Sequence, residues 1–351
     1  IYIDGIRVNN DEIESGILDS KGGQEISTLA GLDPDQIQDI EILKGPAAAA
    51  TYGTDGSNGV VLITTKRGQL IRGAKSYTAN YKYTTGYHEQ SYEYTEDDIL
   101  TYKDANNAFR QGNIEGHNFD ISGGTESARY YFAVGQRSEK GIQINNYLKR
   151  KNFALNLDAM PAENLTLQTT ANYSVSESSR PENDNNIYGW LGNTVLRPTP
   201  YAWLDSLSIA ASDEEVKQTN FRGSISAKYN VLKNLSINGL LGVDNNSIRL
   251  IDYYPPWGNY LYDHGSRQIM TEDNIRYTYN FDIKYSYNIM DGLTGKSALG
   301  TQLMDRELRM NYTQADSLAS DKVKDIASAS QMSNYFESFI TERRAGIFLT
   351  N

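Results

Sequence analysis

The sequence contains no cysteine and only three histidines, which are widely separated (His88, His117 and His264). The absence of thiols excludes disulfide scaffolds, thiolate metal sites and cysteine nucleophiles. The three histidines lack the close spacing of ligands in a zinc site. We therefore expect neither a metal centre nor a cofactor.

The sequence also has no long apolar run and no excess of positive charge. No stretch approaches the ~18 apolar residues of a transmembrane helix. That absence leaves open a membrane barrel, whose lipid-facing residues only alternate along each strand. The formal net charge is -11, so nucleic acid, which binds basic surfaces, is not an expected partner.

Tyrosine is abundant, with 26 residues against 9 Phe and 3 Trp. It suits surfaces that are apolar along the ring and wet at the hydroxyl, as at membrane interfaces. In residues 275–289 every odd position is apolar or aromatic and every even position is polar. Because strand side chains alternate between faces, this segment is predicted to be one long strand with an apolar and a polar face. The apolar face could contact either a second sheet or lipid.

Residues 1–67 differ from the rest and read as a small α/β module. "IYIDGIRV" predicts a strand that turns at Asp4 and Gly5. "LDPDQIQDIEIL" predicts a short helix with Asp33 as its N-cap, Pro34 in its first position and Gln36 closing a capping box. "GPAAAATYG" predicts a second short helix, and the continuous apolar run in "NGVVLITTKRG" predicts a strand buried on both faces.

After a linker at 68–75, alternating strands are predicted to the end of the chain. We expect about ten: 77–83, 118–124, 129–136, 152–160, 165–175, 221–231, 235–245, 275–289, 293–303 and a last one, "RRAGIFLTN", cut by the end of the sequence. Tight hairpins are predicted at 125–127, 161–164, 232–234 and 290–292, and long segments at 88–115, 137–147, 177–219, 248–273 and 311–339. Short and long connections therefore alternate. Such sorting is typical of outer-membrane barrels, whereas soluble sandwiches use Greek-key crossings.

The first 67 residues also carry a family pattern. The segment from "IYIDGIRV" to "LKGPAAAATYGTDGSNGVVLITTKRG" resembles the end of the plug domain of TonB-dependent outer-membrane transporters, and within them the SusC/RagA family. The matching positions are Asp4, Gly5, Leu43, Lys44, Gly45, Ala48 to Ala50, Tyr52, Gly53, Asn58, Gly59, Val60 and Thr65 to Gly68. "NFDISGGTESARYYFAVGQRSEKGI" is similar to that family's second and third barrel strands, so the resemblance covers roughly residues 1–180.

The resemblance implies a mainly β fold, an antiparallel up-and-down transmembrane β-barrel of about 22 strands with an α/β plug in its lumen. The chain would hold about ten of these strands and read as an internal fragment of a longer protein. Residues 1–67 would be the C-terminal part of the plug, 68–75 a linker and 76–351 the N-terminal part of the barrel. The odd residues of 275–289 would then face lipid.

The resemblance further implies TonB-dependent import of a nutrient across the outer membrane of a Gram-negative, Bacteroidetes-like cell. The expected partners are a SusD-like surface lipoprotein and the TonB complex, whose contact segment would lie before residue 1. The expected substrate is an oligosaccharide, with a peptide as the alternative. A passive barrel or adhesin is the competing class, but it gives no reason for a plug. No enzyme is expected, because the carboxylates of Asp97 and Asp98 and of 213–215 are adjacent in sequence rather than placed as a glycosidase pair.

Two groups of residues are candidates for function. Flat rings beside polar groups stack on sugars or hold peptide side chains, and all three tryptophans lie in two predicted loops. The ligand candidates are Tyr188, Trp190, Tyr201, Trp203, Trp257, Tyr260 and Asp263; alternatively, these aromatics pack the loops together or lie at the membrane interface. The plug motif comprises Asp4, Gly5, Lys44, Gly45, Tyr52, Gly53, Asn58 and Gly59, whose small members would allow tight packing beside the barrel wall.

Overall fold

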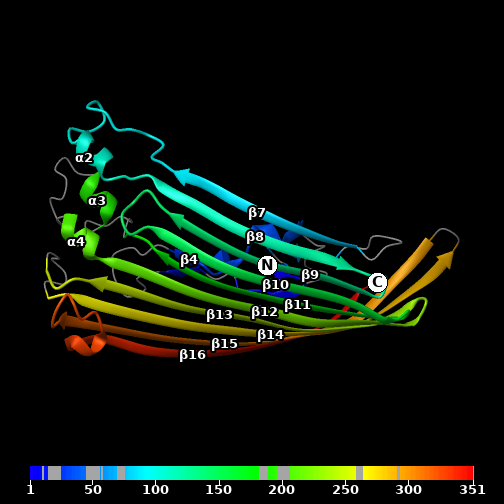
Figure 1. Ribbon diagram of the computed structural model, residues 1–351. Helices are drawn as coiled ribbons and strands as arrows, with labels where there is room; N and C mark the ends of the chain where they lie inside the picture. The colour runs from blue at the N-terminus through cyan, green and yellow to red at the C-terminus, as the bar shows by residue number, and fades with distance from the viewer. Residues whose placement is uncertain are drawn as a thin grey trace.

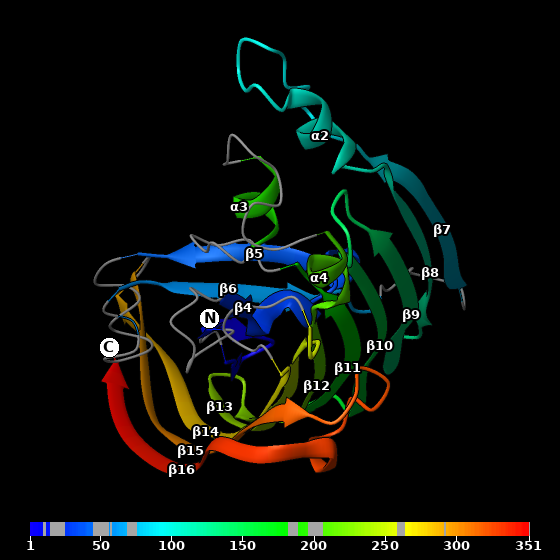
Figure 2. The same ribbon diagram turned by 90° about the vertical axis from the view of Figure 1, so that its left-hand side faces the viewer.

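The computed structural model describes residues 1–9, 12–14, 25–44, 56, 58–68, 76–181, 189–195, 206–257, 264–290 and 293–350. A small N-terminal module lies inside the concave face of one large, curved β-sheet, which we call the wall (Figures 1 and 2). Figure 2 shows the wall curving around the module like part of a cylinder.

The wall consists of ten antiparallel strands in chain order, from β7 at one edge to β16 at the other. The strands are β7 (Ser76–His88), β8 (Gly112–Gly124), β9 (Ala128–Lys140), β10 (Tyr147–Ala162), β11 (Leu165–Ser179), β12 (Asp213–Leu232), β13 (Leu235–Tyr254), β14 (Ser266–Met290), β15 (Leu293–Leu318) and β16 (Ala329–Thr350). The predicted up-and-down sheet of about ten strands is confirmed. The sheet is not closed, because β7 and β16 do not pair with each other.

The connections are sorted between the two ends of the wall, as predicted. Tight turns join β8 to β9, β10 to β11 and β12 to β13. The fourth was predicted at 290–292, of which residues 291 and 292 lie outside the described residues. The helices α2 (Tyr102–Asn107), α3 (Trp190–Thr194) and α4 (Ser206–Ala211) all lie at the opposite end (Figure 1). We call the two ends the tight-turn end and the long-loop end.

The strands are longer than the sequence predicted, and the long connections are correspondingly shorter. β14 has 25 residues and β15 has 26, so the long segments predicted at 248–273 and 311–339 were wrong in extent. The physical reason is that alternation marks only the part of a strand with one apolar face. Toward the long-loop end, backbone pairing continues through segments in which polar and apolar side chains are mixed, such as Gln268, Ile269 and Met270 of β14.

The two faces of β14 follow the predicted alternation. On the convex face, Phe281 is 48% exposed, whereas Thr278 on the concave face is 1% exposed. The concave face is not uniformly polar. Toward the long-loop end it carries an apolar cluster of Val216, Ile248, Leu250, Met270 and Tyr312, which strand register places on the same face as Thr278.

The N-terminal module is built on a four-stranded sheet in the order β2–β1–β6–β5, with β1 parallel to β6. Its elements are β1 (Tyr2–Ile3), β2 (Ile6–Arg7), η1 (Thr28–Gly31), η2 (Pro34–Gln36), β5 (Ile37–Leu43) and β6 (Val60–Thr65), with a separate hairpin of β3 (Glu12–Glu14) and β4 (Glu25–Ser27). Its core contains Ile3, Val8 and Ile63. Asp4 and Gly5 make the predicted turn, with φ of 48° and 83°.

Three predictions for this module have different outcomes. The helix predicted after Asp33 is one 3-10 turn, in which the Asp33 carboxylate accepts a hydrogen bond from the Asp35 amide. The prediction that β6 is buried on both faces holds only in part: Val60, on one face, and Ile63, on the other, are buried, but Thr64 is exposed. The second helix, predicted in "GPAAAATYG", lies outside the described residues.

The facing of β14 generates the first testable prediction. Phe281→Arg places a charge on the convex face and should reduce assembly into a membrane, because a cation at the bilayer midplane costs ~2–4 kcal/mol. Asn280→Arg, on the concave face, is the matched control and should be tolerated better. The measurement is the heat-modifiable protein recovered in the outer-membrane fraction. Equal yields of the two variants would contradict the assignment of the faces.

Candidate functional site

The contact between the module and the wall depends on close approaches at glycine. A Cβ on Gly242, on the concave face of β13, would lie 2.8 Å from Cγ1 of the buried Ile6. A Cβ on Gly68 would lie 2.6 Å from the Tyr130 amide nitrogen, and one on Gly31 would overlap the Asn220 side chain. Real Cβ atoms are not found this close to other atoms, so glycine at these positions lets module and wall meet.

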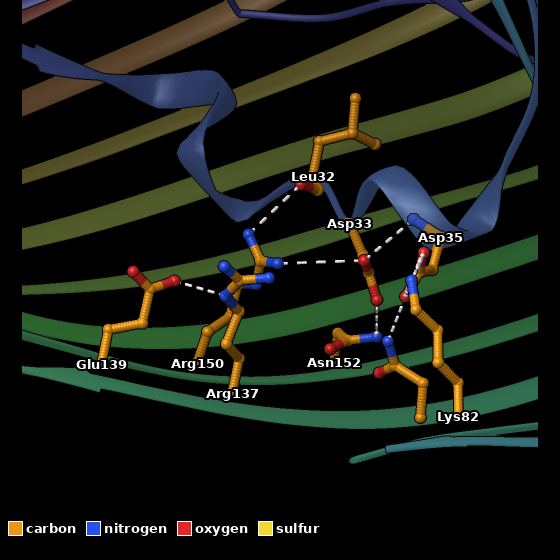
Figure 3. A network of polar contacts seen from close by, with 9 residues as sticks. Leu32, Asp33, Asp35, Lys82, Arg137, Glu139, Arg150 and Asn152 are labelled. Atoms are coloured by element: carbon orange, nitrogen blue, oxygen red, sulfur yellow. Dashed lines mark hydrogen bonds and ion pairs between the residues drawn. The ribbon is translucent and has the colours of Figure 1, made fainter. Parts of the chain in front are cut away.

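The η2 turn of the module bonds to the wall through Asp33 (Figure 3). The Asp33 carboxylate accepts a hydrogen bond of 2.6 Å from Asn152 Nδ2 on β10. Arg150, two residues earlier on the same strand, has Nη2 3.8 Å from Asp33 and donates through Nη1 to the Leu32 carbonyl at 3.4 Å. The buried Asp33 carboxylate is therefore balanced by a cation and an amide from a single wall strand.

Asp35, on the same turn, reaches the neighbouring strands. Lys82 Nζ on β7 donates to both of its carboxylate oxygens, at 2.8 and 3.1 Å, and Asn118 on β8 donates to one of them. Burial by itself raises the pKa of Asp35, but the hydrogen bond and charge of Lys82 and the bond from Asn118 outweigh it, so the pKa lies below 3.8. A cavity of about 400 Å³ lies beside this turn and also borders Arg137.

A second set of polar contacts surrounds Arg67. The Asp4 carboxylate accepts hydrogen bonds from the Thr65 amide and hydroxyl at 3.1 and 2.6 Å. Arg67 lies between this carboxylate, at 3.8 Å, and Asp158 of β10, at 2.6 Å. Asn156 of β10 donates to the Thr65 hydroxyl at 2.9 Å. The first and last parts of the plug motif thus form one network with the wall.

A third set joins the module to β12 and β13. The Asn9 amide donates to Asp244 at 2.9 Å, and Arg222 Nε donates to the same carboxylate at 3.1 Å. The Thr28 carbonyl accepts a hydrogen bond from Gln218 at 3.0 Å. Together the three sets connect the module to β7, β8, β10, β12 and β13. The contact between module and wall is therefore largely polar, and we take it as the candidate functional site.

The predicted plug-motif residues lie in different environments in the structure. Asp4 lies in the Arg67 network, and Gly5 and Gly59 adopt positive φ, the latter at 91°. Lys44 and Asn58 are exposed. Gly45, Tyr52 and Gly53 lie outside the described residues. Asp33 and Asp35 were missed as wall contacts, because the sequence marked Asp33 only as a helix cap and gave no signal for its distant partners.

The predicted ligand residues also lie in different environments. Trp190 is 3% exposed and packs with Ile209 and Phe109, its ring lying 4.9 Å from that of Phe109. This cluster joins α3 and α4 to the loop after α2. Trp257, by contrast, is 39% exposed. Tyr188, Tyr201, Trp203, Tyr260 and Asp263 lie outside the described residues.

Among the described residues, no group of three or more histidines and carboxylates is placed to hold a metal ion. In the same part of the chain, no helix has the length and apolar character needed to cross a membrane.

The glycine contact predicts an asymmetric mutational effect. Gly242→Val should displace Ile6 and loosen the module, because the new side chain overlaps a buried, closely packed one. Gly239→Val is the matched control, since a Cβ there meets nothing within 4 Å. Hydrogen exchange at the amides of residues 2–8 should accelerate only in the Gly242 variant. Unchanged exchange there would show that the close approach does not hold the module.

The two aspartates predict a graded effect. Asp33→Asn should destabilise the seated module by ~1–3 kcal/mol, because it leaves Arg150 without its buried counter-charge. Asp35→Asn should cost only ~0–1 kcal/mol, since its pair with Lys82 is partly exposed. Release of the module with increasing denaturant measures the free-energy cost of each substitution. Asp39→Asn, on the exposed part of β5, is the control.

The lowered pKa of Asp35 sets the pH dependence of its contact. A carboxylate whose pKa is depressed by folding stabilises the folded state above its unfolded pKa and loses that effect as pH falls through the folded value. Because the pKa of Asp35 is lowered, the Lys82 contact should be complete at neutral pH and be lost only at a pH more acidic than the ordinary pKa of an aspartate. An acid-dependent release step of the same size in Asp35→Asn would contradict this assignment.

The module matches a known family. Residues 1–60 match the model of the TonB-dependent receptor plug domain. TonB-dependent receptor P3 of Formosa agariphila is 26% identical over 141 residues, covering 36% of this chain and 14% of that protein. TonB-dependent receptor SusC of Bacteroides thetaiotaomicron is 24% identical over 178 residues, covering 45% of this chain and 17% of that protein.

Solved structures match the whole architecture. The RagAB peptide transporter superimposes with a TM-score of 0.71 at 15% identity, over 99% of this chain and 46% of that chain. The siderophore receptor PiuA from Acinetobacter baumannii gives a TM-score of 0.55 at 13% identity, over 99% and 47%. The chain spans less than half the length of these structures, and these relatives are named as receptors and transporters rather than enzymes. The chain is therefore SusC/RagA-like and similar to TonB-dependent receptors, with a segment that matches their plug domain followed by ten strands of wall.

Proposed function

We propose that this protein is an energy-coupled importer of a nutrient in the outer membrane of a Gram-negative, Bacteroidetes-like cell. The observation that carries the proposal is the plug seated inside the wall by largely polar contacts. Residues 1–67 would serve as the plug region, 68–75 as a linker and 76–351 as the wall. The proposal rests on the plug because a passive pore or an adhesin has no use for a domain that fills its lumen.

The chemistry of the contact between plug and wall suits a plug that moves. Separating two apolar surfaces in water is costly, at roughly 25 cal/mol per Å² exposed. When polar partners such as Asp35 and Lys82 separate, each forms hydrogen bonds with water instead. A typical hydrogen bond therefore stabilises such a contact by only ~0.5–1.5 kcal/mol net. A mechanical pull could therefore free the plug in steps without unfolding the wall.

The relatives and the sorting of the connections support the proposed orientation and partners. Outer-membrane barrels have short periplasmic turns and longer extracellular loops, so the helices α2, α3 and α4 would face outward. We propose a SusD-like lipoprotein as the partner at that end, as the resemblance to the SusC/RagA family implies; one relative is named SusC and one structural neighbour is the RagAB peptide transporter. Energy would come from the TonB complex.

The substrate is proposed to be an oligosaccharide, with a peptide as the alternative. The first choice is what the resemblance to the SusC/RagA family implies, and the name of the RagAB peptide transporter supports the second. Trp257, which is partly exposed, would contact the substrate together with Tyr188, Tyr201, Trp203, Tyr260 and Asp263 of the same two loops. Trp190 would act differently, by fixing the loops through its packing against Phe109 and Ile209.

The loop tryptophans generate a paired prediction. Trp257→Ala should weaken substrate binding without changing the amount of assembled barrel, because it removes only an exposed ring. Trp190→Ala should weaken binding and also loosen the loops, since truncating a buried tryptophan costs ~3–5 kcal/mol. Substrate affinity and proteolysis of the loops measure the two effects, with Leu207→Ala on the exposed part of α4 as control. Unchanged affinity in both variants would remove these loops as the binding site.

The function itself is tested in two steps. An antibody against residues 1–67 should detect a heat-modifiable band in the outer-membrane fraction, and a soluble product would refute the proposal. Cells should then take up labelled oligosaccharides, or peptides in a parallel arm, and a protonophore should abolish this uptake. Uptake that persists without the proton gradient would indicate a passive barrel.

A further inference from the structure

The tight-turn end of the wall contains a basic concavity that the proposed function does not yet use. A cavity of about 430 Å³ lies between the ends of β12 and β13 and those of β14 and β15. Four exposed lysines border it: Lys228, Lys233, Lys284 and Lys296. Asparagine and serine side chains complete the lining, among them Asn230, Asn234, Ser236, Ser286 and Ser297.

Strand register places three of these lysines on the concave face. Lys284 is paired with Ser236 on β13 and Ala298 on β15. Lys228 shares a row with Asn238 and Asp282, and Lys296 is paired with Ser286. All three have the same parity as Thr278, which lies on the concave face. They therefore face the lumen beyond the plug, not the convex face that carries the exposed aromatics.

The positive charge of this concavity is only partly balanced. Lys284 lies 3.4 Å from Asp282, which also accepts a hydrogen bond from Asn238. Within the part of the chain that the structure describes, no carboxylate lies within 4.0 Å of Lys228, Lys233 or Lys296. The chain as a whole carries a net charge of -11. A concave surface lined by one sign of charge focuses the field and concentrates ions of the opposite sign.

We propose that this lysine cluster is an exit-side binding site for a solute that carries several carboxylates. The inference rests on the proposed function, because import places the tight-turn end downstream of the plug. Ammonium groups on flexible stems act as mobile point charges, which suits carboxylates at varying positions along a passing chain. The site would draw an anionic substrate out of the lumen once the plug has moved. It narrows the substrate class to acidic molecules.

Two substrates present this chemistry, a uronate-containing oligosaccharide and an acidic peptide. The experiment therefore uses trigalacturonate and triglutamate as probes, with maltotriose and trialanine as their counterparts without side-chain charge. Calorimetry on the purified, full-length protein gives the dissociation constant of each probe at low and at physiological ionic strength. We expect both charged probes to bind more tightly than their counterparts, and added salt to weaken that binding.

The test variant is Lys228→Gln/Lys284→Gln/Lys296→Gln. This variant removes three exposed lysine charges, each of which would pair with a carboxylate of the probe. Binding of the charged probe should weaken by about tenfold. The charge-matched control is Lys151→Gln/Lys217→Gln/Lys322→Gln, in which three exposed lysines outside the cavity lining are removed. Heat-modifiable migration checks that each variant folds. The single variant Lys296→Gln, at the exposed end of its strand, should also lower the affinity for the charged probe.

The outcomes separate this inference from the importer. Loss of affinity in the cavity variant alone supports the site, and the tighter of the two charged probes identifies glycan or peptide. Equal loss in both triple variants, no loss in either, or no binding to the unmodified protein overturns it. Because calorimetry needs no energy coupling, binding without uptake would count against the importer and leave the site intact. Uptake of neutral substrates, together with no binding of the charged probes, would support the importer and count against the lysine site.

Discussion

The structure depends on the polar contact between the plug and the concave face of the wall. A curved sheet with one polar face must satisfy those groups with water or with another part of the chain, because buried polar groups without partners are costly. Here the plug supplies the partners, through Asp33, Asp35 and Arg67. These three side chains meet residues of β7, β8 and β10, and the backbone amide of Asn9 adds a contact with β13. This arrangement holds the plug in one position through contacts that water can replace.

Glycine makes that contact possible at short range. Ile6 reaches the backbone of β13 only because Gly242 has no side chain, and Gly68 lies directly on the backbone near Tyr130. These positions fix where the plug is seated, whereas the aspartates and arginines fix its orientation through charge. The two kinds of contact differ in how they respond to conditions. Acid weakens a carboxylate contact such as that of Asp35, but a steric fit is insensitive to pH.

The two ends of the wall have different chemistry, and the difference runs along the same concave face. The long-loop end carries the apolar cluster around Ile248 and, above it, loops joined by Trp190. The tight-turn end carries lysines around an open concavity. A solute crossing from one end to the other would therefore leave an aromatic and apolar environment, pass the polar seam of the plug and reach a basic one. The two ends of the concave face therefore differ in chemical character, and this difference arises from the wall rather than from the plug.

The sequence by itself determined the elements that arise from local patterns. Alternation identified the strands and their two faces, turn chemistry placed the tight hairpins, and the motif from Asp4 to Gly68 identified the plug. Only the tertiary structure decided which polar residues meet. Asp33 and Asn152 are 119 residues apart, and Asn9 and Asp244 are 235 apart. Such pairs arise from the register of many strands and the seating of the plug, which no local periodicity encodes. Trp190 was marked as a ligand candidate by its residue type, yet its buried position depends on two other loops for the same reason.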